Sequence, residues 1–118
     1  MTEVINLLKN QKKIELSHVE TLKESMKDLN HPMARVIIEA IIHDSRKHAA
    51  IAQALIEVDA RAQHIEDDRV KAFIDYWISE EKRHHQLLNE LSNLIDRDSV
   101  SLDEYVGLFQ KYKIVPLE

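Results

Sequence analysis

The chain almost lacks the two residues on which tight turns depend. It has one glycine and two prolines in 118 residues, whereas β-hairpins and short connections draw heavily on both. Hydrophobic residues make up 44% of the chain, a normal share for a globular protein. These counts exclude a β-sandwich, a β-barrel and a disordered chain, and they predict long helices with few interruptions. The length is that of one ordinary domain, so we expect a single helical domain over residues 1–118.

Composition also excludes several classes of function. The chain has no cysteine, which excludes disulfides, thiol catalysis, iron–sulfur clusters and zinc ribbons. Its formal net charge is −5, the wrong sign for a protein whose main task is to neutralise phosphates, so nucleic acid is not an expected partner. The segment 1–8 lacks the pattern of a signal peptide, and no apolar run approaches the length that spans a membrane. We therefore expect a soluble, cytoplasmic protein without a membrane partner.

The boundaries between helices are marked unevenly. A first helix is predicted to begin near Thr2. The run Asn30–Pro32 predicts a stop and a restart, because asparagine tolerates a left-handed C-terminal position and proline suits the first turn of a helix. The second helix ends without such a mark, and an acidic run places a turn near 62–68. Ser101 and Glu104 have the spacing of a capping box and predict a short fourth helix.

Apolar residues recur at steps of three and four along each predicted helix. Three stripes are long, and the fourth covers at most about three turns. The predicted fold class is therefore all-α, an antiparallel bundle of three long helices plus a short C-terminal helix. An alternative fuses the second and third helices into one rod that pairs with another chain. The stripe residues are Ile5, Leu8, Val19, Leu22, Met26 and Leu29, then Ile37, Ile41, Ile51, Leu55 and Val58, then Val70, Ile74, Trp77, Leu88, Leu91 and Ile95, and finally Leu102, Tyr105, Val106, Phe109 and Tyr112.

Each long stripe is interrupted by polar residues near its middle. Counting from the turns, at about 1.5 Å of rise per residue, places the three interruptions at nearly the same height in the bundle. They should therefore share one layer. The interrupting residues are Glu15 in the first helix, Asp44 or Ser45 and His48 in the second, and Glu81 and His84 in the third.

Such a polar layer has two physical explanations. A carboxylate or imidazole in an apolar core destabilises the fold unless it is paired, hydrogen bonded or bound to a metal. One solution is a divalent cation, and mixed oxygen and nitrogen ligands suit iron, manganese or zinc better than calcium or magnesium. The other is a buried network of salt bridges and hydrogen bonds that specifies the register of the helices without a metal.

The run Glu80–His84 contains a Glu-x-x-His motif, formed by Glu81 and His84. Together with Glu15 in the first helix, this motif resembles the ferritin-like superfamily, and rubrerythrin-like members in particular. The resemblance covers the three long helices. It implies two metal ions, usually iron, in the middle of a four-helix bundle, and chemistry such as ferrous oxidation, peroxide reduction or oxygen chemistry.

The chain departs from that family pattern in three respects. Ser45 stands where the second motif's glutamate is expected, with Asp44 as a possible substitute. The fourth helix is too short to carry a ligand at mid-height. The rubredoxin-like iron site of full rubrerythrins needs cysteines that this chain lacks, so any redox partner must be separate. The site then holds fewer metals, is completed by a second subunit, or is a degenerate relic.

These observations predict a ferritin-like metal-binding bundle suited to iron-dependent oxidation or peroxide handling, with catalytic turnover left open. The alternative is a non-catalytic helical interaction module with a buried polar network and no metal. The expected cofactor is a divalent metal, iron first and manganese or zinc next. A homodimer or higher homo-oligomer is expected, because the short fourth helix leaves an apolar groove that another subunit could fill. The predicted metal ligands are Glu15, Asp44, His48, Glu81 and His84.

Several residues next to the predicted ligands are assigned to other roles. Glu81 rather than Glu80 is predicted to face the core, because successive helical residues point about 100° apart. His18 follows Glu15 by three residues, yet the apolar stripe prefers Val19 at this level. The residues assigned to ordinary surface pairs are Glu39, His43, Glu80 and His85, and the aromatic residues assigned to the core are Phe73, Tyr76 and Trp77.

Overall fold

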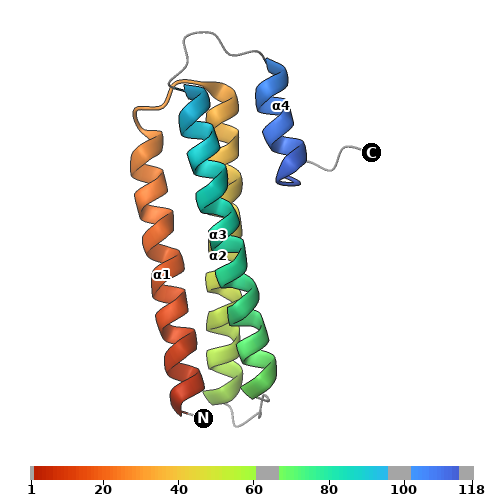
Figure 1. The fold of residues 1–118 in the computed structure, drawn as a ribbon. Coiled ribbons are helices and arrows are strands. Elements are labelled where there is room, and N and C mark those ends of the chain that lie inside the picture. Colours follow the sequence, from red (N-terminus) through yellow and green to blue (C-terminus); the bar gives the residue numbers. More distant parts are fainter. Residues whose placement is uncertain (1, 61–66, 96–101, 115–118) are drawn as a thin grey trace.

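Three long helices lie side by side, and a short fourth helix packs near one end of them (Figure 1). The computed structural model describes residues 2–60, 67–95 and 102–114. Within these ranges every regular element is an α-helix: α1 (Thr2–Met26), α2 (Pro32–Ala60), α3 (Asp67–Ile95) and α4 (Leu102–Lys111). The all-α class, with three long helices and a short C-terminal one, is confirmed for this part of the chain.

The chain reverses between α1 and α2 where the sequence predicts. Pro32 is the first residue of α2, as its fixed φ favours. However, α1 already ends at Met26, and Asn30 does not adopt the predicted left-handed conformation. The reason is a different cap. The Arg35 guanidinium donates hydrogen bonds to the carbonyls of Met26 and Leu29, at 2.7 and 3.0 Å, and so satisfies acceptors at the end of the helix.

The third helix returns alongside the second (Figure 1). Asp67 and Asp68 lie in the first turn of α3, where negative charge is favourable, whereas most of the turn predicted near 62–68 lies outside the described residues. His84 of α3 and Asp44 of α2 approach within 3.4 Å. The two helices are therefore packed against each other, and the alternative of one continuous rod is wrong.

A polar layer divides the apolar core into two clusters. The upper core joins all four helices, and the lower core joins the beginning of α1, the end of α2 and the beginning of α3. The polar layer between them contains Gln11, Glu15, Ser45 and His48, all at most 5% exposed. The upper core consists of Val19, Leu22, Ala34, Ile37, Ile38, Ile41, Ile42, Leu87, Leu91, Tyr105, Leu108 and Phe109, and the lower core of Val4, Leu8, Ala52, Val70, Ile74 and Trp77.

Some predicted stripe positions are wrong by one residue. Val4 rather than Ile5 is fully buried in α1, and Leu87 rather than Leu88 in α3. A pattern of three- and four-residue steps does not distinguish adjacent positions, which differ by about 100° around the helix. Leu87 lies two turns beyond Glu80, so the corrected stripe brings Glu80 toward the buried side of α3. Two further stripe residues, Ile95 and Leu102, are exposed.

The short α4 is attached to α3 through Glu90. The Glu90 carboxylate accepts hydrogen bonds from the Lys111 ammonium, at 2.6 Å, and from the Tyr112 hydroxyl. Ser101, the predicted N-cap of this helix, lies outside the described residues. The residues that α4 buries are Tyr105, Leu108 and Phe109.

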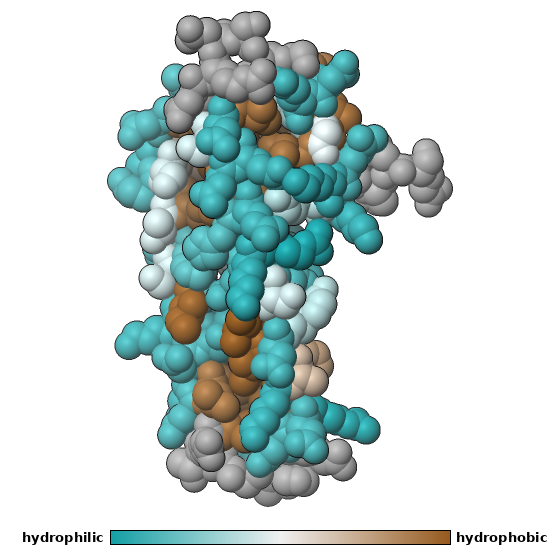
Figure 2. Space-filling view, in the orientation of Figure 1, coloured by the Kyte–Doolittle hydropathy of each residue, from teal (hydrophilic) through white to brown (hydrophobic). Residues whose placement is uncertain are grey.

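Polar side chains cover most of the face shown in Figure 2, and hydrophobic side chains appear between them in separate patches. Of the aromatic residues assigned to the core, Trp77 is buried, but Phe73 and Tyr76 are 43% and 61% exposed. The assignment of these two residues to the core is therefore wrong. In the described ranges, no helix combines the length and the apolar character that crossing a membrane requires.

Candidate metal centre

Glu15 lies at the centre of the polar layer. His48 Nδ1 lies 3.3 Å from Glu15 Oε1, and the Gln11 amide donates a hydrogen bond to the same oxygen at 3.1 Å. The buried Ser45 lies in the same layer. Burial alone would raise the pKa of Glu15, but these hydrogen bonds and the electrostatic attraction of His48 outweigh burial and lower the pKa. The carboxylate is therefore held ionised inside the core.

Glu81 faces the same amide but has the opposite pKa shift. The Gln11 amide donates to Glu81 Oε1 at 3.2 Å, and His18 Nδ1 lies 3.7 Å from that oxygen. Burial and the negative charge of Glu15 raise the pKa of Glu81 above its ordinary value. Two carboxylates thus share one amide donor, and an added cation would relieve their repulsion.

Glu15, His18 and Glu81 form the first candidate metal site, called the inner site here. One donor atom from each residue lies within 4.8 Å of the other two. Glu15 and His18 are one turn apart on α1, and Glu81 approaches from α3. Two carboxylate oxygens and one imidazole nitrogen make a donor set that suits iron, manganese and zinc.

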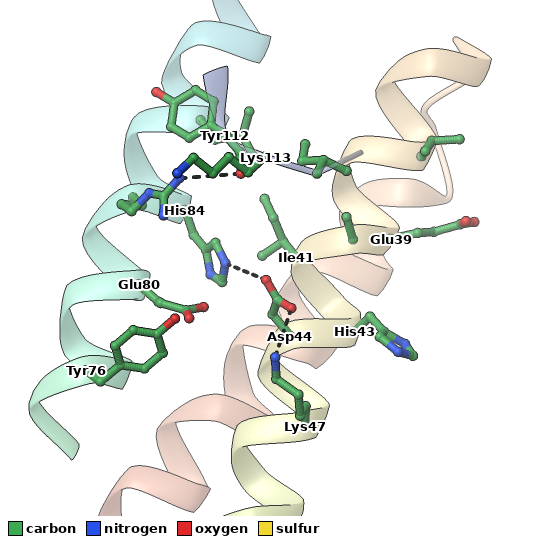
Figure 3. Close-up of a pocket in the computed structure, with 15 residues that line it drawn as sticks. Glu39, Ile41, His43, Asp44, Lys47, Tyr76, Glu80, His84, Tyr112 and Lys113 are labelled. Carbon is green, nitrogen blue, oxygen red and sulfur yellow. Dashed lines mark hydrogen bonds and ion pairs between the residues drawn. The ribbon is translucent and has the colours of Figure 1, made fainter. Parts of the chain in front are cut away.

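Asp44, Glu80 and His84 form a second candidate, called the outer site here, between α2 and α3 (Figure 3). Their donor atoms also lie within 4.8 Å of one another. His84 Nε2 lies 3.4 Å from Asp44 Oδ2, and this hydrogen bond lowers the pKa of Asp44 despite partial burial. The outer site repeats the chemistry of the inner one, with two carboxylates and one imidazole.

His48 lies between the inner and outer sites. Its Nδ1 faces Glu15, and its Nε2 lies 3.5 Å from Glu80 Oε2. The imidazole stacks on Trp77, with ring centroids 5.5 Å apart and ring planes at 25°. Packing therefore fixes the orientation of the imidazole, with one ring nitrogen near a carboxylate of each site.

Two fully buried atoms in the polar layer, Glu15 Oε2 and His48 Nε2, have no hydrogen-bond partner among the described residues. Glu80 reaches ion-pair distance of His48 Nε2 without the geometry of a hydrogen bond. Buried polar atoms are nearly always hydrogen bonded in native proteins, and an unsatisfied one costs about 1–3 kcal/mol. Both atoms are types that bind metal ions, so the residues present fit a metal.

The structure divides the five predicted ligands between two sites instead of collecting them in one. The two positions of α2 that the sequence left open lie in different surroundings: Ser45 is buried in the polar layer, whereas Asp44 is half-buried and pairs with His84. Of the predicted ligands, Glu15 and Glu81 belong to the inner site, Asp44 and His84 to the outer site, and His48 lies between them.

Two candidate ligands were assigned elsewhere from the sequence. Glu80 was expected on the surface, but its side chain is only 14% exposed and contacts His48, so this assignment is wrong. His18 is partly exposed, as the preference for Val19 implies, yet it reaches Glu81. A sequence signal existed for both, because His18 follows Glu15 by three residues and Glu80 precedes His84 by four.

We expect Glu81→Gln to remove part of the pH dependence of stability. A carboxyl whose pKa is raised by folding contributes stability below its unfolded value of about 4.5, and this contribution is lost as the pH rises through the folded pKa. The metal-free parent should therefore lose stability relative to the variant from about pH 4.5 upward. Thermal melts of both proteins across this range measure the difference. A constant difference would contradict a raised pKa for Glu81.

The donor atoms of both sites are carboxylate oxygens and imidazole nitrogens, held on three helices at the same height. This arrangement can bind a divalent cation, and it can also hold a proton between Glu15 and Glu81. Comparison of the chain with protein-family models, with curated proteins and with solved structures finds no match.

Proposed function

We propose that this protein binds divalent metal ions in the middle of its helical bundle, with iron as the first candidate and manganese or zinc next. The observation that carries the proposal is the pair of unsatisfied buried atoms, Glu15 Oε2 and His48 Nε2. They lie where two carboxylate and imidazole triads meet. A cation bound there would satisfy these atoms and offset the repulsion between Glu15 and Glu81.

We extend this proposal to ferritin-like chemistry, in the sense of iron-dependent oxidation or peroxide handling. It is supported by the i, i+3 spacing of glutamate and histidine in both Glu15–His18 and Glu81–His84, and by two triads in one chain. Bound iron would supply one-electron redox chemistry, whereas the residues of the chain would hold and orient it. His48, with a nitrogen toward each site, would link the two sites.

We also infer that the protein self-associates. Large hydrophobic side chains remain exposed on all three long helices, and α4 extends along only part of them (Figure 1). A second subunit that covers these side chains would complete a four-helix arrangement. The exposed side chains on the long helices are Leu7, Leu16, Val36, Phe73, Tyr76, Ile78 and Ile95.

The only tryptophan of the chain provides a direct test of metal binding. Trp77 stacks on His48, so we expect ferrous iron or manganese, which are paramagnetic, to quench its fluorescence and saturate at two metal equivalents per chain, one per triad. Chelator-treated full chain should be titrated without oxygen. Elemental analysis then gives the metal content, and sedimentation of the same sample gives the size of the assembly.

An exposed glutamate gives the matched control for this titration. Glu20 lies on α1, one and a half turns from Glu15, with a side chain 76% exposed. Glu20→Gln should bind two metal equivalents like the parent, whereas Glu15→Gln should lose the equivalent bound at the inner site and keep the one bound at the outer site. If the parent retains no metal and its fluorescence does not respond, the proposal fails.

The second candidate function is the non-catalytic interaction module, and one observation favours it. The Gln11 amide donates to both Glu15 and Glu81, and His48 pairs with Glu15, so part of the layer is satisfied by the protein alone. A metal-free protein with full stability and an assembly through the exposed hydrophobic side chains would support this function instead.

A further inference from the structure

A cavity of about 630 Å³ lies between α2, α3 and the residues that follow α4 (Figure 3). This volume is in the range of pockets that hold small molecules. The outer site forms part of the lining, and three cationic side chains from separate elements form another part: Lys47 of α2, Arg83 of α3 and Lys113 just beyond α4. The cavity therefore combines a candidate metal site with cations that do not belong to it.

Lys113 has an unusual backbone conformation for a lysine. Its φ is 55°, in the left-handed region that glycine adopts without strain. Lys113 N–H donates to the carbonyl of Gln110, and Ile114 N–H donates to that of Phe109. These two bonds end α4 in a Schellman motif, in which glycine is the usual residue at this position. Lysine at a strained position that lines a cavity indicates a role for its side chain.

The other two cations also have donors available for a ligand. The Arg83 guanidinium donates one hydrogen bond, at 3.4 Å, to the carbonyl of Tyr112, and it carries five N–H groups in all. Lys47 lies 3.7 Å from Asp44 and is 57% exposed. Within the described residues, the Lys113 ammonium makes no hydrogen bond or ion pair.

The charge of this cavity depends on the outer site. Its acidic lining residues are Glu39, Asp44 and Glu80, and the other titratable ones are His43, Tyr76, His84 and Tyr112. Without a metal, the carboxylates of Asp44 and Glu80 face the cavity, whereas the carboxylate of Glu39 points away from them (Figure 3). A divalent metal held by the outer site would compensate the first two carboxylates, release Lys47 from Asp44 and leave the cavity positive.

We propose that this cavity binds the oxyanion group of a small metabolite, a phosphate or a carboxylate, through Arg83 and Lys113, with Lys47 adding positive charge to the same lining. A planar guanidinium matches the oxygens of either group, and the two ammonium groups add charge without a fixed geometry. One part, that metal at the outer site tightens anion binding, rests on the proposed function. The anion site itself depends on the cations alone.

Calorimetric titration of the full chain with methyl phosphate and, separately, with succinate tests the proposal. Metal-free and manganese-treated samples are compared after their metal content has been measured. We expect saturable binding, about threefold or more tighter in the metal-loaded sample, and the stronger probe identifies the favoured group. If the manganese-treated sample takes up no metal, the proposed function is refuted. The titration of the same protein with methyl phosphate and succinate still tests the anion site. If neither probe binds in either sample, the anion site is refuted.

Matched variants separate a built site from general charge attraction. Arg83→Gln and Lys113→Gly should each weaken binding about five- to tenfold, whereas Lys82→Gln and Arg46→Gln, exposed neighbours that do not line the cavity, should not. Lys113→Gly should also raise Tm by about 4 °C, since glycine relieves the strain, so its weaker binding would not reflect unfolding. Equal losses in Arg83→Gln and Lys82→Gln, or unchanged binding in Lys113→Gly, would overturn the proposal.

Discussion

Glutamine in place of Glu15 should destabilise the metal-free protein, whereas glutamine in place of Glu81 should stabilise it. The pKa of Glu15 is lowered, which means that the fold stabilises its ionised form through His48 and Gln11. Neutral glutamine weakens those charge-assisted hydrogen bonds, and we expect a loss of about 1–3 kcal/mol in the free energy of unfolding. Urea unfolding of the metal-free proteins near neutral pH measures it.

The opposite sign at Glu81 follows from its raised pKa. Burial and the charge of Glu15 disfavour the ionised form of Glu81, so a neutral side chain of the same shape should add about 1 kcal/mol of stability at neutral pH. Glutamine keeps an oxygen that accepts the Gln11 hydrogen bond. Glu20→Gln, on the exposed side of α1, should change stability by less than about 0.5 kcal/mol.

Metal binding should also be measured for Glu15→Gln and Glu81→Gln, because each variant removes a ligand of the inner site. We expect each to weaken binding at that site by about 100-fold or more, although their metal-free stabilities move in opposite directions. Destabilisation by both variants, together with no metal in the parent, would identify Glu81 as a structural partner and would support the network without metal.

The largest loss of stability should come from Trp77→Ala. Trp77 is 2% exposed, lies in the lower core and stacks on His48. Removing a buried tryptophan ring leaves a cavity and costs about 3–5 kcal/mol, a large share of the roughly 5–15 kcal/mol that stabilises a typical domain. Urea unfolding followed by circular dichroism measures the loss, since the variant has no tryptophan fluorescence.

Two aromatic neighbours provide controls for this substitution. Phe73 and Tyr76 lie on the same helix but are 43% and 61% exposed, so truncation to alanine should cost less than about 1 kcal/mol at each. If Trp77→Ala does not fold, Trp77→Leu retains most of the apolar contact and should still be clearly less stable than the parent. Equal losses at all three positions would contradict the described core.

Several features of this protein could be predicted from the sequence because they depend on local chemistry. One glycine and two prolines leave few places for a turn, so long helices follow. Proline favours the first turn of a helix, and α2 begins at Pro32. A carboxylate that interrupts an apolar stripe becomes buried when that face of the helix packs against its neighbours. Glu15 interrupts such a stripe, and it is 1% exposed.

Only the tertiary structure decided which polar side chains meet. Two adjacent helical residues point about 100° apart, so both can point partly inward when the core lies between their two directions. Glu80 and Glu81 do so, toward different neighbours. Gln11 is an ordinary polar residue in the sequence, and its bridging role exists only because α3 brings Glu81 beside Glu15. The helical class and the polar interruption were thus determined locally. The division of the ligands into two sites was determined by the rotation of each helix about its own axis, which packing sets.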